Sequence, residues 1–583
     1  MKLHLPKLLS TAVLLSILST ATAAVITQAP PDADGSIKYH VEEAGLEPST
    51  IYTAESGNAD FIMQNHDTLG IYKENGTLIT HDFGKSYEGT ISGPAYTNEL
   101  CIGSGSSTTK KANLIMSGYA KIALGGQYRS VPSSSGSVST DKYIGITAKD
   151  VTMSENAELI AGKANFSSLT VSGNASVSLH GKNSVTENSG ATEYTGGNTL
   201  NVNKYFTNLS SSDKVSTISG KLEISDSAQV TIGVDNGQYG SGEKYKTNHW
   251  LNQLGGTIVQ NSNTKTDDTP LSNLAIKGKT FFSGAMNITQ NGGNMEIGLK
   301  EADDRKAIVY LKSTTNNKIT QTGNGTIKIG KMINGTSTVS ASQLIVNQSG
   351  TGIIDLENGV EYTSNTASTI TQSGGGIINL SGDFSRAVFD IEQSKGSINL
   401  KSGAKMASNI LSLNTAATLN IAGTMTVNDK LSFNLTTPGQ ETAAIVMASG
   451  GNIEVADMTS AVEFNLEDAI ISDMKMEALA YTAETGEAEY TYTIDLISGL
   501  SVADKEEFDT LIENGKLSWS LELPQALSES TITSTELLES GIQWSDSGDT
   551  LQLYTTWKSV PEPATATLSL LALATLAARR RRK

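Results

Sequence analysis

The segment Ile319-Thr-Gln321-Thr-Gly-Asn-Gly-Thr-Ile327 decides the fold, because variants of it recur along the chain. Each copy has a short apolar-Xaa-Gln strand, and in most copies a Gly-rich turn and a second alternating strand follow. The other copies begin at Ile258-Val-Gln260, Ile288-Thr-Gln290, Val346-Asn-Gln348, Ile370-Thr-Gln372 and Ile391-Glu-Gln393. Self-similarity of this kind predicts stacked units that bury a shared core.

The second half of each copy alternates apolar and polar residues. Ile354 and Leu356 flank Asp355, and Ile378 and Leu380 flank Asn379. A period of two is typical of a strand with one buried face, and no helical period is present. The intervals between successive glutamines from 290 to 393 shorten from 31 to 27, 24 and 21 residues, as loops of different length at the corners would allow. We therefore expect an all-β chain whose body is a right-handed parallel β-helix, with one coil per repeat.

Each repeated glutamine lies two residues after an isoleucine or valine, so both side chains leave the strand on the same face. If the aliphatic residue points inward, so does the amide. Stacked coils would then form an interior amide ladder, which provides the hydrogen-bond partners that buried amides need. The alternative is an outward row of glutamines on a solvated face. The ladder would contain Gln260, Gln290, Gln321, Gln348, Gln372 and Gln393.

A second motif, Met116-Ser-Gly-Tyr-Ala120, recurs as Val171-Ser-Gly-Asn-Ala175 and, beyond the glutamine repeats, as Leu413-Asn-Thr-Ala-Ala417. Its presence on both sides predicts one continuous solenoid over residues 111–435. Residues 24–110 lack the motif and are interpreted as an N-terminal cap. Three histidines in this cap, His40, His66 and His81, have no spacing suited to a metal site, so we expect neither metal nor cofactor.

The first 23 residues have the pattern of a secretory signal peptide. Lys2 and Lys7 precede an apolar run, and Ala21-Thr22-Ala23 is a small-residue cleavage site for signal peptidase. Cys101 is the only cysteine of the 583 residues, which excludes an intrachain disulfide. The stability of the exported chain must therefore come from the stacked strands.

Residues 436–558 differ in composition and are predicted to be a separate, smaller, strand-rich domain. From Glu441 to Lys558 there are 23 Asp and Glu against 4 Lys and Arg. This acidity disfavours nucleic acid as a partner and favours a soluble surface. A helix is expected between a capping Ser501 and Gly515, with Phe508 on its buried face.

The last 25 residues, 559–583, contain three consecutive signals. Pro561, Glu562 and Pro563 precede fifteen apolar or small residues, which in turn precede Arg579, Arg580, Arg581, Arg582 and Lys583. This segment resembles the PEP-CTERM sorting signal of Gram-negative bacteria. The resemblance implies a C-terminal transmembrane sorting helix whose basic end stays in the cytoplasm, processing by an exosortase-type enzyme, and an association with exopolysaccharide biosynthesis. The repeat body is similar to the passenger regions of autotransporters.

Two function classes are compatible with these features. We expect an exported structural or adhesive protein at the cell surface, in the outer membrane or in the extracellular matrix, anchored transiently in the inner membrane. Its expected partners, besides signal peptidase and the sorting enzyme, are extracellular polysaccharide or host glycan. The alternative is a carbohydrate-active β-helix enzyme, either a polysaccharide lyase or a glycoside hydrolase.

An enzyme of that kind needs acids that converge on one cleft wall. The candidates are Asp267-Asp268 and the group Glu301, Asp303 and Asp304, with Arg305 beside it. Adjacent acids on one strand point to opposite faces, and no nucleophile elbow, phosphate-binding loop or Cys/His pair is present. We therefore expect no catalytic activity.

Overall fold

The structure is a computed structural model that describes part of the 583-residue chain. The described residues are 26–28, 31–41, 49–52, 60–70, 87–88, 99–103, 111–124, 128–129, 145–162, 164–179, 186–187, 206–207, 216–233, 251–262, 271–299, 309–311, 316–334, 343–358, 366–435, 443–455, 462–466, 468–485, 487–514, 519–522 and 535–559.

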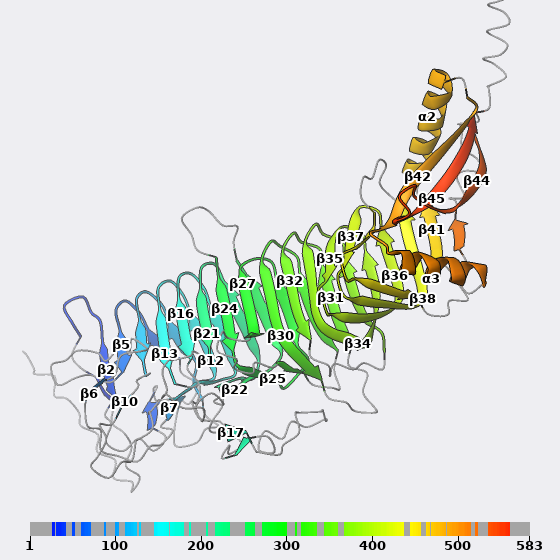
Figure 1. Cartoon of the computed structure of the whole chain (residues 1–583). Coiled ribbons are helices and arrows are strands. Elements are labelled where there is room, and N and C mark those ends of the chain that lie inside the picture. The colour runs from blue at the N-terminus through cyan, green and yellow to red at the C-terminus, as the bar shows by residue number, and fades with distance from the viewer. Residues whose placement is uncertain are drawn as a thin grey trace, which may run out of the picture.

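The chain forms a long parallel β-helix that ends in a small cap (Figure 1). Each coil contributes strands to as many as three ladders, and within a ladder every strand pairs in parallel with its counterpart in the next coil. The chain winds into coils because the strands of most coils have only three to six residues and are joined by tight turns, as the repeats predict. Late coils merge neighbouring strands into longer ones, such as β34 (Ile377–Gln393).

Ladder 1 carries the glutamines. Its strands are β4 (Phe61–Met63), β8 (Leu114–Met116), β12 (Asp150–Met153), β15 (Ser168–Val171), β20 (Lys221–Ser225), β23 (Thr257–Asn261), β26 (Asn287–Gln290), β29 (Asn317–Gln321), β31 (Leu344–Gln348), β33 (Ser368–Gln372), β34, β36 (Lys405–Asn414), β38 (Thr424–Leu435), β41 (Val462–Leu466) and β43 (Trp519–Glu522).

Ladder 2 follows the Gly-rich turns. Its strands are β2 (Lys38–Val41), β5 (Thr68–Gly70), β9 (Lys121–Ala123), β13 (Glu158–Ala161), β16 (Ser176–Leu179), β21 (Gln229–Ile232), β24 (Asn273–Lys277), β27 (Asn294–Leu299), β30 (Thr326–Asn334), β32 (Ile353–Asn358), the first part of β34, β35 (Gly396–Leu400), β37 (Ala417–Ile421), β39 (Ile445–Met447) and β42 (Glu489–Ser498).

Ladder 3 closes the coils. Its strands are β3 (Ser49–Tyr52), β7 (Glu99–Gly103), β11 (Gly145–Thr147), β14 (Ala164–Phe166), β19 (Ser216–Ile218), β22 (Leu251–Leu254), β25 (Lys279–Phe282), β28 (Val309–Leu311) and the end of β30. In the last coils, the first halves of β36 and β38 pair with each other, and β40 (Asn452–Val455) pairs with β38.

Three short pairs lie outside these ladders. β1 (Ile26–Gln28) adds to β2 in antiparallel orientation. β6 (Tyr87–Glu88) pairs with β10 (Tyr128–Arg129), and β17 (Thr186–Glu187) pairs with β18 (Phe206–Thr207).

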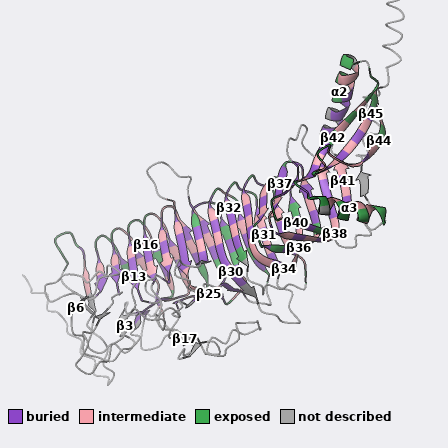
Figure 2. Ribbon diagram, viewed as in Figure 1, coloured by how far each residue is buried: buried purple, intermediate pink, exposed green. Residues whose placement is uncertain are grey.

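A single apolar core runs the length of the solenoid and into the cap, from Phe61 to Trp557. Alternate residues of each strand enter it, so buried and half-buried residues form stripes across the coils (Figure 2). Because every coil buries its apolar face against both neighbours, the core extends with the number of coils and not with their width.

The solenoid begins earlier than the sequence indicated. The expected N-terminal cap, residues 24–110, contains β2, β4 and β5, and each of these pairs in parallel with a strand of a later coil. Residue 111 is therefore not the start of the β-helix. The described strands before it have only two to five residues, and the turn from Met63 to Leu69 matches the later turns in shape but holds Asp67 where they hold alanine, so the sequence motif is not recognisable there.

The acidic segment, residues 436–558, is continuous with the solenoid and not a separate body. β39, β40, β41 and β43 extend the parallel ladders beyond residue 435, and the rings of Phe433 and Phe464 stack across the expected boundary with centroids 5.8 Å apart. The composition changes after residue 435 but the strand pairing continues, so the charge of the segment wrongly indicated a domain boundary there.

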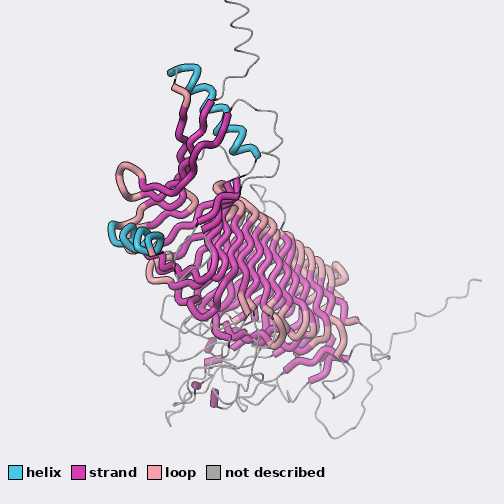
Figure 3. The backbone as a smooth tube through the Cα atoms, turned by 90° about the vertical axis from the view of Figure 1, so that its right-hand side faces the viewer, coloured by secondary structure: helices cyan, strands magenta, loops and turns pink. Residues whose placement is uncertain are grey.

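At the C-terminal end of the solenoid, the parallel ladder is followed by an antiparallel sheet with two helices, and this part is called the cap. β42 pairs in parallel with β39 and in antiparallel with β45 (Thr550–Ser559), which also pairs with β44 (Thr535–Trp544). Two helices complete it: α2 (Asp468–Thr485), which packs on β42 and β45, and α3 (Val502–Glu513). The helix expected after Ser501 is α3, with Phe508 buried, whereas α2 was not expected from the sequence. Figures 1 and 3 show α2 and the antiparallel sheet projecting beyond the coils.

Within the described ranges, no helix is long and apolar enough to cross a membrane. The expected sorting helix lies beyond Ser559, the last described residue, and the signal peptide precedes Ile26, the first one.

Candidate functional site: stacked amide rows along the solenoid

The six repeated glutamines occupy one column inside ladder 1. Strand register pairs each with the next, from Gln260 to Gln393, and every one of the six side chains is at most 1% exposed. They therefore lie on the inward face with the aliphatic residues two positions before them, and not in an outward row.

The amides bond head to tail along the column. Nε2 of Gln321 donates to Oε1 of Gln290 at 2.9 Å, and the carbonyls of Gly325 at 2.8 Å and Ile353 at 3.1 Å are also within its reach. The same pattern recurs in every later coil, where amide-to-amide distances are 2.7, 2.6 and 2.8 Å for Gln348, Gln372 and Gln393. Each side chain thus joins its own turn to the coils on either side.

The two ends of the column differ. At the N-terminal end, Nε2 of Gln260 donates to Oγ of Ser272 at 3.0 Å and to the carbonyl of Asn294 at 2.9 Å. At the C-terminal end the next residue in register is Leu413, and Oε1 of Gln393 is buried without a hydrogen-bond partner. The head-to-tail direction explains this, because the last carbonyl has no further amide to accept from.

Glycines in the turns provide the space for the amides. A Cβ at Gly352 would lie 2.8 Å from Cδ of Gln321 and 2.2 Å from the carbonyl oxygen of Gly325. Gly376 stands in the same relation to Gln348, at 2.6 Å from Nε2. By contrast, a Cβ at the neighbouring Gly375 would have its nearest contact at 4.0 Å. A side chain at these turn glycines would therefore clash both with the buried amide and with the turn carbonyl of the preceding coil.

The same column is apolar in the earlier coils. Its members there are Met63, Met116, Met153, Val171 and Ile224. Four residues after the last four of these, the turn position holds a buried alanine: Ala120, Ala157, Ala175 and Ala228. After Leu413 the turn position is again an alanine, Ala417. Aliphatic side chains are thus coupled to alanine turns, and glutamines chiefly to glycine turns.

A second amide row lies on the outer face of ladder 2. Asp355, Asn379, Asn399 and Asn420 are in register, and all four are half-buried. Nδ2 of Asn379 donates to Oδ1 of Asp355, and Asn399 and Asn420 each donate to the preceding asparagine at 2.8 Å. In the two coils directly before Asp355, the same column holds Glu296 and Lys328, which are bonded to each other at 3.3 Å. Each amide is partly open to solvent and can meet an external ligand.

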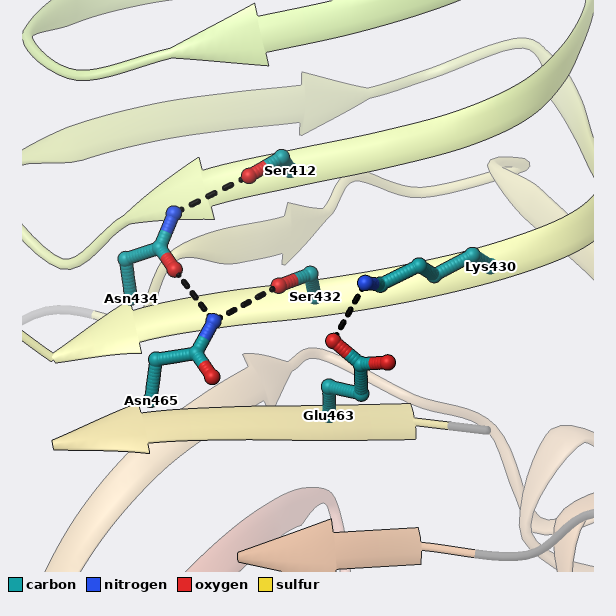
Figure 4. Close-up of polar contacts among 6 residues, drawn as sticks. All are labelled: Ser412, Lys430, Ser432, Asn434, Glu463 and Asn465. Atoms are coloured by element: carbon teal, nitrogen blue, oxygen red, sulfur yellow. Dashed lines mark hydrogen bonds and ion pairs between the residues drawn. The ribbon is translucent and has the colours of Figure 1, made fainter. Parts of the chain in front are cut away.

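A shorter polar row occurs on ladder 1 near the cap (Figure 4). Nδ2 of Asn465 lies 2.7 Å from Oδ1 of Asn434, and Nδ2 of Asn434 donates to Oγ of Ser412 at 2.9 Å. Beside them Lys430 forms an ion pair with Glu463. These contacts link three successive coils where the solenoid meets the cap.

The remaining candidate residues do not form a site in the described part of the chain. His66 stacks on Tyr119 of the next coil, with ring centroids 5.0 Å apart. His40 is in β2, and its side chain is outside the described set. Among the described residues, no group of three His, Cys, Asp or Glu could hold a metal ion. Outside the described residues lie His81, Asp267, Asp268, Glu301, Asp303, Asp304, Arg305, Ala21, Ala23, Pro561, Glu562, Pro563 and residues 579–583.

Comparison with known proteins adds one finding. Residues 559–583 match the family model described as the PEP-CTERM protein-sorting motif. No curated protein and no solved structure matches the chain. The motif marks proteins that are exported and sorted to the cell surface by a C-terminal membrane-anchoring signal, and it implies processing by an exosortase-type enzyme.

Proposed function

We propose that this exported, surface-sorted chain is a structural or adhesive rod with no catalytic role, and that it contacts extracellular polysaccharide through its outer polar rows. The observation that carries the proposal is the unbroken ladder 1, from β4 to β43, around one core. Its fourteen parallel pairings span about 67 Å at ~4.8 Å per pairing. A stack of this kind keeps its shape over its whole length because each coil is bonded to both neighbours.

The outer amide row of Asp355, Asn379, Asn399 and Asn420 is the surface favoured for contact. Its members repeat once per coil, at about the 4.8 Å spacing of paired strands. Amides offer both donors and acceptors, which suits a ligand rich in hydroxyl groups. Ile353 and Ile377 stand two residues before Asp355 and Asn379 on the same outward face, and both are half-buried. The face therefore combines hydrogen-bonding and apolar strips, like the two kinds of surface that a sugar ring presents.

The direct test is binding of the mature chain to a glycan array and to extracellular polysaccharide from the producing cell. We expect binding that falls at least tenfold in the variant Asn379→Ala/Asn399→Ala/Asn420→Ala. Unchanged binding would remove the row from the proposal, and absence of any glycan binding would leave only the structural rod.

A matched control is available on another face. Thr289, Thr320 and Thr371 point outward from β26, β29 and β33 in one column of ladder 1, in which Asn347 of β31 stands between the last two. The variant Thr289→Ala/Thr320→Ala/Thr371→Ala should keep wild-type binding. If both triple variants lose binding equally, loss of structure and not of a contact is the cause, and circular dichroism melts of both variants identify it.

The absence of catalysis is tested separately. The mature chain is incubated with the polysaccharides that bind best, and new reducing ends and unsaturated uronic products are measured over a day. We expect neither product to rise above a boiled control. A time-dependent rise that requires Asp267 or Glu301 would replace this proposal with the lyase or hydrolase alternative.

A further inference from the structure

The sorting motif follows the cap without an intervening linker. β45 ends at Ser559, and the matched motif begins at the same residue. One residue, Val560, separates Ser559 from Pro561. Since an extended chain advances at most about 3.6 Å per residue, Pro561 lies within about 7 Å of Ser559, and the apolar stretch from Ala564 starts within about 18 Å.

The strand that leads into the motif is fixed up to its last residue. β45 is the central strand of the antiparallel sheet, so it is hydrogen-bonded to β42 on one side and to β44 on the other. The backbone N–H of Ser559 donates to the carbonyl of Ala488 at 2.8 Å. Two residues earlier, Trp557 is 2% exposed. Strand pairing and side-chain burial therefore hold the start of the tail in place.

Helix α2 provides the packing that holds Trp557. Oγ1 of Thr555 donates to Sδ of the buried Met474 at 3.5 Å, and Nε1 of Trp557 donates to Oγ1 of Thr555 at 3.0 Å. Nζ of Lys475 lies 5.9 Å from the centre of the Trp557 ring. The cap projects beyond the coils, at the end of the solenoid opposite β2 and β5 (Figure 1).

We infer that, in the unprocessed protein, the cap is the part of the solenoid that lies against the membrane. Because β45 is fixed up to Ser559 and few residues follow before the apolar stretch, the end of the antiparallel sheet and the C-terminal end of α2 lie against the lipid headgroups. The coils then stand away from the bilayer, with the N-terminal coils farthest from it. The partner surface is a lipid bilayer, and the end of the rod that is presented outward is the N-terminal one.

The test measures the distance of three positions from the bilayer in the full, unprocessed chain. Single cysteines are placed in a Cys101→Ser background by Glu484→Cys in α2, Lys405→Cys in a late coil and Thr152→Cys in an early coil. All three native side chains are exposed. The chain is reconstituted in phosphatidylethanolamine–phosphatidylglycerol vesicles that carry a nitroxide quencher on the headgroup, and the cysteines carry a fluorophore.

We expect quenching to fall several-fold from position 484 to position 152, with position 405 between them. Equal quenching at the three positions would mean that the rod lies flat on the membrane and would overturn the proposal, as would stronger quenching at position 152. A full chain that fails to float with the vesicles, or that floats equally well when truncated after Ser559, contradicts it as well.

Two variants distinguish a cap that is held in one orientation at the membrane from a cap that is only linked to it by a flexible chain. A flexible insert of about twenty Gly and Ser residues between Ser559 and Val560 should abolish the order of quenching while the chain still floats. Trp557→Ala should weaken the order. The control Trp544→Ala alters a ring of the same cap that packs by α3, where its Nε1 donates to Oδ1 of Asp509 at 2.9 Å, and should leave the order intact. An order unchanged by the insert would contradict the role of the short connection after Ser559.

Discussion

The early and middle coils solve the same packing problem with different chemistry. In the column that contains Met153, Val171 and Ile224 the interior is apolar and the turn position holds alanine. In the column's continuation from Gln260 to Gln393 the interior is a chain of amides, and the turn position is glycine in every coil after the first. Backbone pairing is the same in both regions. The difference teaches that register is compatible with either interior, provided that the turn changes together with the side chain.

The amide coils and the apolar coils differ in how strongly a substitution in the column lowers the stability of the fold. A missing methyl group in an apolar column leaves a small void, whereas a missing amide leaves its neighbour's donor or acceptor buried without a partner. The glutamine coils should therefore tolerate substitution less well than the apolar coils, and they specify register more strictly. Three substitutions in the glutamine coils test this contrast and a fourth lies outside the column; they follow in order of expected effect on the free energy of unfolding.

A charge in the column should have the largest effect. In Gln348→Glu one carboxylate oxygen replaces a donor that faces Oε1 of Gln321 and the carbonyl of Gly352. That oxygen meets acceptors only, while the other oxygen still accepts from Nε2 of Gln372. We expect a loss of about 4 kcal/mol at pH 7, as for an uncompensated buried charge. Urea melts measure it.

The pH dependence of this variant has a definite sign. Burial raises the folded-state pKa of the introduced carboxyl above its unfolded value, so the folded state holds the proton more tightly. Stability should therefore increase as pH falls below that raised pKa and decrease as pH rises through it. A loss that is independent of pH between 4 and 7 would contradict the buried position of Gln348.

The coupling of glycine to glutamine is the next contrast. Gly376→Ala places a Cβ 2.6 Å from Nε2 of Gln348 and 2.5 Å from the carbonyl oxygen of Gly352. We expect a loss of about 3 kcal/mol from this overpacking. Gly375→Ala, one residue earlier and open to solvent, should change stability by less than about 0.5 kcal/mol. Because Gly→Ala lowers the entropy of the unfolded chain and by itself stabilises, equal losses at the two positions would contradict a clash specific to Gly376.

Removal of one amide should cost less than a charge or a clash. Gln348→Leu leaves Oε1 of Gln321 buried without its donor and takes away an acceptor of Gln372, for which we expect about 2 kcal/mol. Gln393→Leu is the matched control, because its Oε1 has no partner already and its neighbour in register is Leu413. It should cost about 1 kcal/mol less. Equal losses in thermal or chemical melts would argue against directional stacking.

The smallest expected effect is outside the column, at Asp390. Burial raises the pKa of this carboxyl, an effect to which the charge of Asp429 adds and which a backbone hydrogen bond from Ile410 opposes. Because the folded pKa is raised, the carboxyl costs stability as pH rises through it. Asp390→Asn should therefore stabilise the chain slightly at pH 7, and the gain should vanish near pH 4. Melts at both pH values measure it, and a gain of equal size at both would contradict the titration.

Much of the solenoid could be predicted from residue spacing. The two-residue offset between Ile319 and Gln321 places both on one face, and repetition places successive glutamines next to each other. What spacing did not indicate was the reason for Gly325 or Gly352, since a glycine-rich turn is expected whether or not a side chain needs the room. The contacts of a hypothetical Cβ show that need only once neighbouring coils are placed.

The cap was less predictable, for two physical reasons. Its acidity suggested an independent domain, but charge is a property of the surface and does not report the pairing of β41 with β43. Helix α2 had a usable signal in Ile470, Ile471, Met474 and Ala478, which recur at helical spacing and are all buried. That signal was hidden among the strand patterns on either side.

The central claim is that six glutamine side chains form one buried, directional stack. Hydrogen exchange of glutamine side-chain amides, followed by NMR on the protein labelled with nitrogen-15 at glutamine Nε2, tests it most directly. The account predicts six slowly exchanging amide groups, assigned through single substitutions to Gln260, Gln290, Gln321, Gln348, Gln372 and Gln393, with Gln348 among the slowest. Exchange of these six at the rate of exposed glutamines would contradict the stack.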